Sequence, residues 1–394
     1  MYQSDFPLLE HEPIVYLDSA ASTQKPRCVL EKMFQFYTQS YANVHRGSCA
    51  LANQATILYE EARQKVARFI HALPSQVVFT KGTTESINLI ANSYAQTLRE
   101  GDEVLISIAE HHANFVPWQQ ACLKSKATLK TFRVLPSGEI DLDDYYKQLS
   151  SKTKLVAVTH LSNVLGIVNP IETIVQTAHH VGAKVVVDGA QSIAHMPIDV
   201  QQLNCDFFVF SGHKLYAPTG IGVLYGTSNV LEMLQPYQFG GDMIKEVTIQ
   251  QSTFADVPAK FEAGTPPIAQ AIGLGFALDY LSHIGMAKIE SQETELTCYL
   301  LDSLKQFSGI QLLGDSSMKK GIVSLTVPNI HVSDIAFVLA KQNICVRTGH
   351  HCAMPLHRFF DLTGSLRISL GVYTTQTDID LFIKGFKKAI QLFQ

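Results

Sequence analysis

The sequence predicts an α/β protein whose large domain is built on a mostly parallel, doubly wound sheet, with a smaller α+β domain after it. Short β-branched runs alternate with helical patterns from about residue 76 onward, which is typical of βαβ units. The three valines at 185–187 indicate a strand covered by helices on both faces. The length of 394 residues exceeds what one core usually supports, so we expect two domains.

The β-branched runs place the strands of the large domain at residues 77–80, 104–108, 128–134, 155–159, 184–188 and 207–210. Parallel strands have their carboxyl ends at one edge of the sheet, and open α/β folds bind their ligands there. The residues that directly follow these strands are therefore the first candidates for a functional role.

The pattern changes after Gly264. Apolar residues at helical spacing predict helices at 268–284, 287–307, 333–342 and 378–393, and β-rich runs predict strands at 322–327 and 344–347. We expect a large domain over residues 16–282. Residues 1–15 and 283–394 would form the small domain.

Composition excludes several classes of protein. The net charge is -4 and the basic residues are scattered, which argues against nucleic-acid binding. Seven cysteines without CxxC spacing predict neither a disulfide framework nor a zinc ribbon, and fit a reducing compartment. No apolar run approaches the ~20 residues of a membrane span, and the N-terminus does not resemble a signal peptide. We expect a cytoplasmic protein without a membrane or metal site.

Two motifs place opposite charges after strands. Lys214, in SGHK, follows the strand at 207–210; taken alone, a surface lysine is the more common explanation. Asp188 ends the strand at 184–188, with Gln191 three residues later. A carboxylate there is costly unless it meets a cation, although a turn or helix cap would also explain it. The protonated pyridinium nitrogen of pyridoxal phosphate would be such a cation.

Two further motifs suit the rest of that cofactor. Thr83 and Thr84 follow the strand at 77–80 and open a helix, where free N–H groups favour a phosphate, although ordinary capping explains the pattern too. With Ser211 and His213 they predict a phosphate cup. His112, in EHHAN, could stack on a planar ring and exchange protons, while a structural role is the alternative.

Together these motifs resemble the fold-type I pyridoxal-phosphate enzymes, in particular the SufS/CsdA class of cysteine desulfurases within the class-V aminotransferase family. The resemblance runs from LDSAAS (17–22) and NVHRG (43–47) through SNVLG (162–166) and FEAGTP (261–266) to RTGHHCAMPL (347–356) and SLRISLG (365–371). One departure is Cys49, where SufS members often carry a histidine.

The resemblance implies a role for each matching residue. The catalytic residues would be Lys214, which forms the Schiff base, Cys352, which accepts sulfur, and His112. The cofactor-binding residues would be Thr83, Thr84, His112, Asp188, Gln191, Ser211, His213 and Lys214, with Thr265 reaching the phosphate from the second subunit of a homodimer. The substrate-binding residues would be Asn163, Arg347 and Arg367.

Cys352 and Arg367 each have an alternative explanation. HHC could suggest a metal site, yet three neighbouring ligands without a distant fourth make a poor tetrahedron. A loop cysteine beside two histidines suits a thiolate better. Arg367 could simply extend outward from its strand, but its planar fork also suits a bidentate grip on a carboxylate.

The implied reaction converts L-cysteine to L-alanine and leaves the sulfur on Cys352 as a persulfide. An acceptor protein of the SufE, CsdE or SufU kind would then take the sulfur for iron–sulfur cluster assembly, and L-selenocysteine would also react. Two alternatives stay open. An aminotransferase or kynureninase-like lyase needs Lys214 and Asp188 but not Cys352, whereas a non-catalytic sulfur carrier or Cys/His metal scaffold needs only Cys352.

The segment around Cys352 is short. Cys352 lies fifteen residues before Arg367, and the apolar residues between them are expected to tie the segment down. We therefore expect a recessed persulfide and an acceptor that docks at the mouth of the site.

Overall fold

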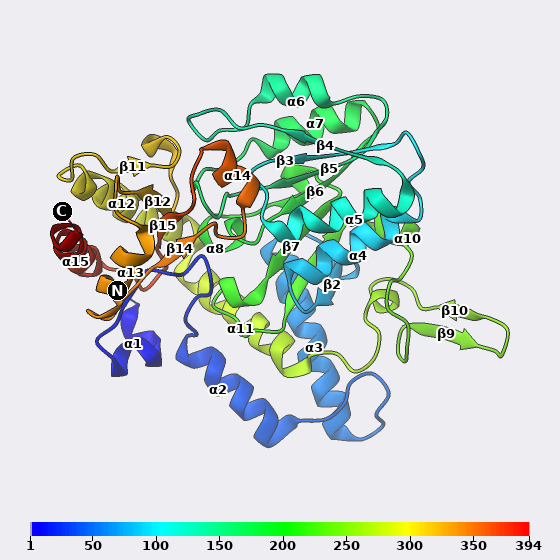
Figure 1. Ribbon diagram of the computed structural model, residues 1–394. Helices are drawn as coiled ribbons and strands as arrows, with labels where there is room; N and C mark the ends of the chain where they lie inside the picture. The colour runs from blue at the N-terminus through cyan, green and yellow to red at the C-terminus, as the bar shows by residue number, and fades with distance from the viewer. Residues whose placement is uncertain (1, 394) are drawn as a thin grey trace.

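The large domain is organised around a mostly parallel sheet, as expected. The computed structural model describes residues 2–393, and within them this sheet has seven strands in the order β2-β8-β7-β6-β5-β3-β4 (Figure 1). Their bounds are β2 (Val77–Thr80), β3 (Glu103–Ser107), β4 (Thr128–Phe132), β5 (Thr153–Thr159), β6 (Lys184–Asp188), β7 (Phe207–Ser211) and β8 (Gly222–Gly226). All six expected strands form. The sequence analysis missed β8, a short run between glycines that pairs antiparallel with both β2 and β7.

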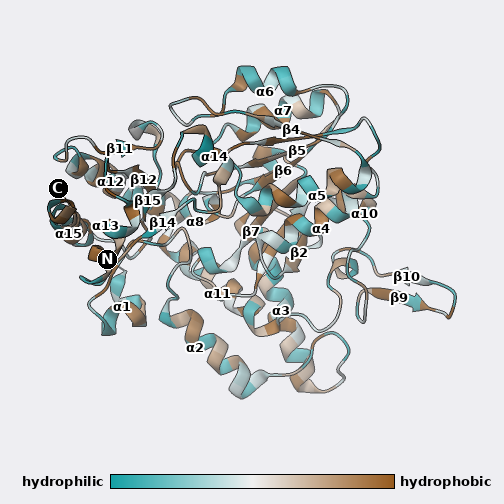
Figure 2. Ribbon diagram, viewed as in Figure 1, coloured by the Kyte–Doolittle hydropathy of each residue, from teal (hydrophilic) through white to brown (hydrophobic). Residues whose placement is uncertain are grey.

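Helices cover both faces of this sheet, as the valine run predicted. Val185 and Val187 belong to one buried cluster and Val186 to another, which shows that successive side chains enter opposite cores. The first core includes residues of α3 (Ala50–Phe69), α7 (Ile171–His180) and α11 (Ile268–Ile284), and the second those of α4 (Thr83–Ala95), α5 (Val116–Ser125) and α10 (Ser228–Met233). Figure 2 shows apolar residues on the sheet and a largely hydrophilic outer helix α6 (Leu142–Gln148).

The C-terminal part forms a second core. Helices α12 (Met286–Leu304), α13 (Val332–Ala340) and α15 (Gln376–Phe393) accompany a four-stranded sheet ordered β11-β12-β15-β14 within the described residues. Its strands are β11 (Gln311–Leu312), β12 (Ile322–Thr326), β14 (Arg347–Gly349) and β15 (Ser365–Ser369). The strand expected at 344–347 is split, because β13 (Ile344–Cys345) pairs with β1 (Val15–Tyr16) instead.

The domain division stays a proposal. α11 ends at Ile284, and Gly285 adopts a positive φ of 92° between α11 and α12. We propose the boundary at Gly285, three residues after the expected position. Residues 2–15 contribute to both cores, since Phe6 packs into the large core and Val15 into the small one.

The other elements are short. They are α1 (Pro7–His11), α2 (Arg27–Gln35), α8 (Ser192–His195), α9 (Val200–Leu203), α14 (Met354–Phe359), and the projecting hairpin of β9 (Ile244–Val247) and β10 (Ser252–Phe254) (Figure 1). Over residues 2–393, each helix is too short or too polar to cross a bilayer.

Candidate active site

A cavity of about 460 Å³ opens at the carboxyl edge of the central sheet and is also lined by residues of β14 and β15. Most of the predicted site residues line it. They are Thr83, Thr84, Asn163, Asp188, Gln191, Ser211, His213, Lys214, Arg347, Cys352 and Arg367. Segments far apart in the chain therefore meet at one place, and the cavity is a candidate active site.

Lys214 lies in a short 3₁₀ turn, Gly212–Lys214, directly after β7. A Cβ atom at Gly212 would lie 2.7 Å from Cγ2 of Ile221, so the turn needs glycine to pack against the strand. Burial lowers the pKa of the Lys214 amine to about 8, against the opposing effect of Asp188. A substantial fraction of the amine is therefore neutral near physiological pH.

Asp188 is only 4% exposed at the end of β6. The Ala190 N–H donates to its Oδ1 over 2.9 Å, and burial raises its pKa. Within residues 2–393 its carboxylate forms no ion pair at 4.0 Å or less. A buried carboxylate facing a cavity without a bonded cation fits a protonated ring nitrogen.

A cup of N–H and hydroxyl groups lies at the start of α4. Gly82 precedes the helix, and the Thr83 N–H donates to Oγ of Ser211 over 2.8 Å. The hydroxyl oxygens of Thr83 and Ser211 are also 2.8 Å apart. Thr84 is exposed and lines the cavity, and burial lowers the pKa of the neighbouring His213 to about 4. These groups fit a phosphate at a helix N-terminus.

The two adjacent histidines separate in the structure. His111 lines the cavity, whereas His112, the predicted residue, does not. The His112 ring instead accepts the Met354 N–H at Nε2 over 3.1 Å. Burial lowers the pKa of His111 to about 3, so its ring is neutral. Because Nδ1 of His111 accepts the Ala113 N–H, the hydrogen of the neutral ring is on Nε2.

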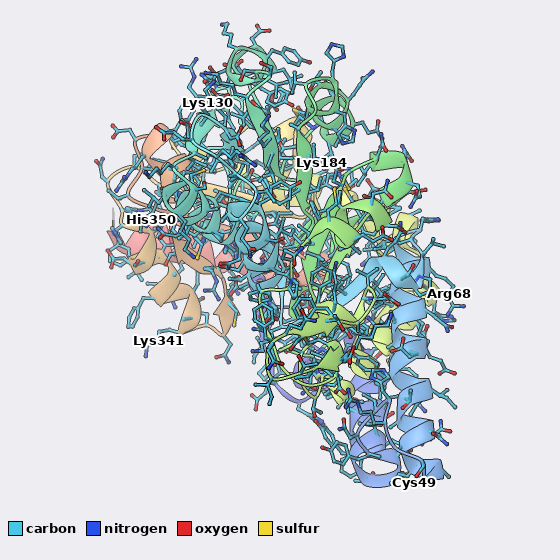
Figure 3. The ribbon with its side chains drawn as sticks, turned by 90° about the vertical axis from the view of Figure 1, so that its right-hand side faces the viewer. Cys49, Arg68, Lys130, Lys184, Lys341 and His350 are labelled. Carbon is cyan, nitrogen blue, oxygen red and sulfur yellow. The ribbon has the colours of Figure 1, made fainter. Side chains whose placement is uncertain are left out.

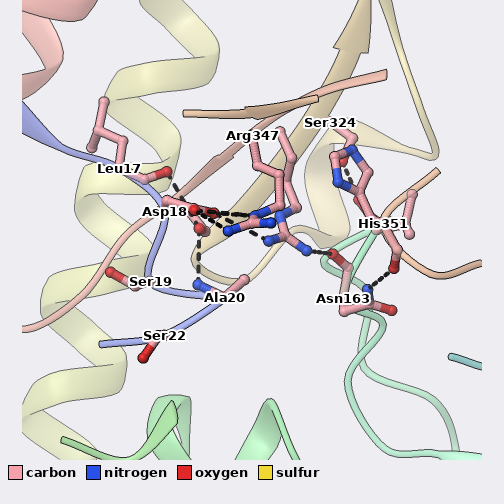
Figure 4. A network of polar contacts seen from close by, with 12 residues as sticks. Leu17, Asp18, Ser19, Ala20, Ser22, Asn163, Ser324, Arg347 and His351 are labelled. Carbon is pink, nitrogen blue, oxygen red and sulfur yellow. Dashed lines mark hydrogen bonds and ion pairs between the residues drawn. The ribbon is translucent and has the colours of Figure 1, made fainter. Parts of the chain in front are cut away.

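An arginine pair forms the wall opposite the sheet. Arg347 donates to both carboxylate oxygens of Asp18, and Nη2 of Arg367 donates to Oδ1 of Asp18 over 3.3 Å (Figure 4). Nη1 of Arg367 donates to the Asn163 carbonyl over 3.1 Å, and the Asn163 amide donates to the His351 carbonyl. Nε of Arg367 is buried without a partner in the described structure.

Asp18 was missed by the sequence analysis. It lies in LDSAAS, a motif that was used only for the resemblance. The carboxylate neutralises one of the two guanidinium charges, which leaves one net positive charge for an anionic group in the cavity.

Cys352 lines the cavity on a turn with a positive φ of 57° and is exposed in the single chain. The prediction of a recessed cysteine is therefore wrong for the single chain. The segment is nevertheless held, because the Cys352 carbonyl accepts the His112 N–H over 2.6 Å and Ala353 and Leu356 are fully buried. Met354 and Phe359 are exposed and do not tie the segment down.

Two other residues lie outside the cavity. Thr265 is exposed and does not line the cavity of its own chain, so its contribution from a second subunit stays a prediction. Cys49 precedes α3 at the far end of the molecule from His350, the neighbour of the Cys352 turn (Figure 3). Among residues 2–393, no group of three or more His, Cys, Asp or Glu side chains is arranged to hold a metal ion.

The fold and the cavity define a class of protein, and comparison with known proteins agrees. Residues 15–382 match the model of the aminotransferase class-V family, so the chain belongs to that family. Enzymes of this family depend on pyridoxal phosphate.

Individual relatives show to which group of enzymes within this family the chain is most similar. The chain is 48% identical to a probable cysteine desulfurase of Halalkalibacterium halodurans, covering 98% of this chain and 97% of the relative. It is 47% identical to a probable cysteine desulfurase of Synechocystis, covering 99% and 95%. The crystal structure of the cysteine desulfurase CsdA from Escherichia coli superposes with a TM-score of 0.93 at 39% identity, covering 100% and 98%. Within the class-V family, this chain belongs to the cysteine desulfurases.

Proposed function

We propose that the cavity between the domains is the active site for converting L-cysteine to L-alanine, with the sulfur retained on Cys352 as a persulfide. The observation that carries this proposal is that Lys214 and Cys352, from different domains, line one cavity together with an arginine pair. A simple aminotransferase needs no cysteine at this position, and a sulfur carrier needs no buried lysine beside a buried carboxylate.

The cavity fits pyridoxal 5'-phosphate. Lys214 would hold the cofactor covalently, Asp188 would bond its ring nitrogen, and Gln191 would face its ring oxygen. The cup of Thr83, Thr84, Ser211 and His213 would hold the phosphate. When bound, the cofactor withdraws electrons from the substrate Cα, which makes the Cα–H bond acidic.

Lys214 is the proton carrier in this proposal, and His111 helps to position the cofactor and the substrate. The lowered pKa of Lys214 allows a neutral amine to take the Cα proton near physiological pH. His111 takes the role that the sequence analysis gave to His112, because its neutral ring faces the cavity with Nε2 as a hydrogen-bond donor. It would stack on the cofactor ring and orient the substrate.

The arginine pair would orient the substrate carboxylate. Nη1 and Nη2 of Arg367 each use one of their two hydrogens in these bonds, and Nε has no partner in the described structure, so N–H groups remain that can donate to a carboxylate. Arg347 supplies a second cation from the adjacent strand, and Asn163 fixes the position of Arg367. This arrangement would turn the substrate Cβ and sulfur toward Cys352.

The sulfur step balances without an external oxidant. The Cys352 thiolate attacks the substrate sulfur, an S–S bond forms, and the Cβ–S bond breaks. The electron pair of that bond stays on the three-carbon fragment, which leaves as alanine after protonation. Cys352 is left as a persulfide.

We also propose the wider setting that the sequence predicts. The enzyme would act in the cytoplasm as a homodimer in which Thr265 reaches the phosphate of the other subunit. It would transfer sulfur to an acceptor of the SufE, CsdE or SufU kind for iron–sulfur cluster assembly, and L-selenocysteine would be a second substrate.

The reaction type can be tested directly. The purified holoenzyme is incubated with L-cysteine, with L-selenocysteine, and with L-alanine plus a 2-oxo acid, and the products are measured. Alanine formed from the first two substrates, without amino-group transfer to the 2-oxo acid, supports a desulfurase. Amino-group transfer without alanine formation from L-cysteine would show an aminotransferase.

A further inference from the structure

The loop that carries Asn163 is fixed by the small domain. It spans residues 162–167 between β5 and α7, and the carbonyls of Val164, Leu165 and Gly166 all accept hydrogen bonds from groups on or near β12. Ser324 Oγ donates to the Val164 carbonyl over 2.6 Å, and the Lys320 N–H donates to the Gly166 carbonyl over 2.7 Å.

Glycine permits this close approach. Gly166 has a φ of 69°, and a Cβ atom there would lie 2.1 Å from the Ile322 carbonyl oxygen. The loop backbone therefore lies directly against β12, and any larger residue at 166 would push the loop away from the small domain.

Lys319 supplies the third bond, at unusual cost. Its side chain is only 4% exposed, and its Nζ donates to the carbonyls of Leu165 and Leu313. Burial of a charged amine without a bonded carboxylate is unfavourable. A methionine or leucine could be buried there at a lower cost in free energy. A buried ammonium group that joins two carbonyls of different segments fixes the distance between those segments.

The same contacts extend to the reacting groups. Val164, Leu165 and Ile167 share a buried cluster with Leu313 and with two residues of the Cys352 segment, Ala353 and Leu356. The Asn163 main chain accepts from Arg367, and its side chain donates to the His351 carbonyl beside Cys352 (Figure 4). A shift of this loop would therefore displace the guanidinium group of Arg367.

We propose that Lys319 is a positioning residue, which holds the 162–167 loop so that Asn163 aligns Arg367 for the carboxylate of the substrate. This inference rests on the proposed function, in which Arg367 binds that carboxylate. Lys319 contacts neither the cavity nor the reacting atoms.

A pair of ligands that differ only in the carboxylate tests the proposal. L-alanine and ethylamine are titrated into the holoenzyme, and binding is followed by the absorbance of the cofactor. In Lys319→Met, which keeps the apolar stem, we expect the Kd of L-alanine to rise about tenfold and that of ethylamine to change less than about twofold. Amide hydrogen exchange at Ser162 and Gly166 should also become faster.

Lys320→Met is the matched control. The Lys320 Nζ bonds Glu290 instead of the loop, and its main-chain N–H remains available to Gly166, so both ligands should bind as in the wild type. If Lys319→Met does not fold, Ser324→Ala removes the adjacent bond to the same loop and is measured in its place. An unchanged L-alanine affinity, or equal weakening of both ligands, would overturn the proposal.

A third variant separates this inference from the proposed function. Arg367→Met should bind L-alanine no better than ethylamine. If Arg367→Met binds L-alanine like the wild type, the carboxylate site itself is wrong. If Arg367→Met loses L-alanine and Lys319→Met does not, only the positioning role is wrong.

Discussion

Arg347 and Arg367 lie directly opposite each other on the antiparallel strands β14 and β15, and both donate hydrogen bonds to Asp18. Two guanidinium groups in register would repel each other without this carboxylate. The triad therefore combines a structural ion pair with one net positive charge for the substrate.

Asp18→Asn should destabilise the protein, because it leaves the buried Arg367 guanidinium without its anionic partner. We expect the free energy of unfolding to fall by about 3 kcal/mol, measured by urea denaturation of the apoprotein. Asp302→Asn is the control, since its pair with Lys305 is solvent-exposed and should contribute little to stability. Equal effects of the two substitutions would contradict the assigned role of Asp18.

Lys214→Ala should abolish alanine production from L-cysteine, since the attachment point of the cofactor and the base for the Cα proton are lost together. Borohydride reduction of the wild type should fix the cofactor on the peptide that contains Lys214. Lys25→Met is the control for a second lysine with similar properties. Burial also lowers the pKa of Lys25 to about 8, and its Nζ donates to the His213 carbonyl. Appreciable desulfuration by folded Lys214→Ala would refute the assignment.

His111→Ala and His112→Ala should differ in their effect on kcat. Because His111 faces the cavity, its loss should lower kcat by about 100-fold. His112 accepts the Met354 N–H outside the cavity, so its loss should change kcat by less than about tenfold. Steady-state rates of alanine formation measure both effects. A larger loss of kcat in His112→Ala than in His111→Ala would assign the role to His112.

A sulfur acceptor should stimulate turnover severalfold. The Cys352 turn is held by the His112 N–H and by the buried Leu356, so it cannot carry sulfur far from the cavity. The acceptor must therefore approach the exposed cysteine and take the sulfur by thiol exchange. Alanine production at low reductant, with and without a candidate acceptor, measures this. Equal rates would show that release of the persulfide does not limit turnover.

Sequence alone predicted much of the fold because the strands of the large domain are continuous β-branched runs. It also led to Lys214 and Asp188, which line the same cavity, since Asp188 ends one such run and Lys214 comes shortly after another at one edge of the sheet. It chose His112, whereas His111 lines the cavity, because the direction of each ring depends on tertiary contacts that the sequence does not show. Asp18 was missed because its partners Arg347 and Arg367 are 329 and 349 residues away in the chain.

Lys319 is a second residue whose role depends on tertiary contacts and could not be predicted from the sequence. A lysine next to a second lysine and close to serines and an aspartate, in DSSMKKG, is typical of an exposed loop. Its burial follows from the approach of the 162–167 loop to β12, which depends on the packing of two domains. β8 was missed for a related reason, since its glycines leave too short an apolar pattern to indicate a strand.

The most direct test of the account follows the sulfur atom in a single turnover. The holoenzyme is mixed with L-cysteine without reductant, alanine is quantified, and the peptide containing Cys352 is analysed by mass spectrometry, with Cys352→Ser and Cys345→Ser in parallel. We predict alanine and persulfide in equal amounts, with the extra sulfur on Cys352. Cys345→Ser should behave like the wild type, and Cys352→Ser should form neither product from L-cysteine. Full alanine formation by Cys352→Ser, or a persulfide located on Cys345, would contradict the central claim.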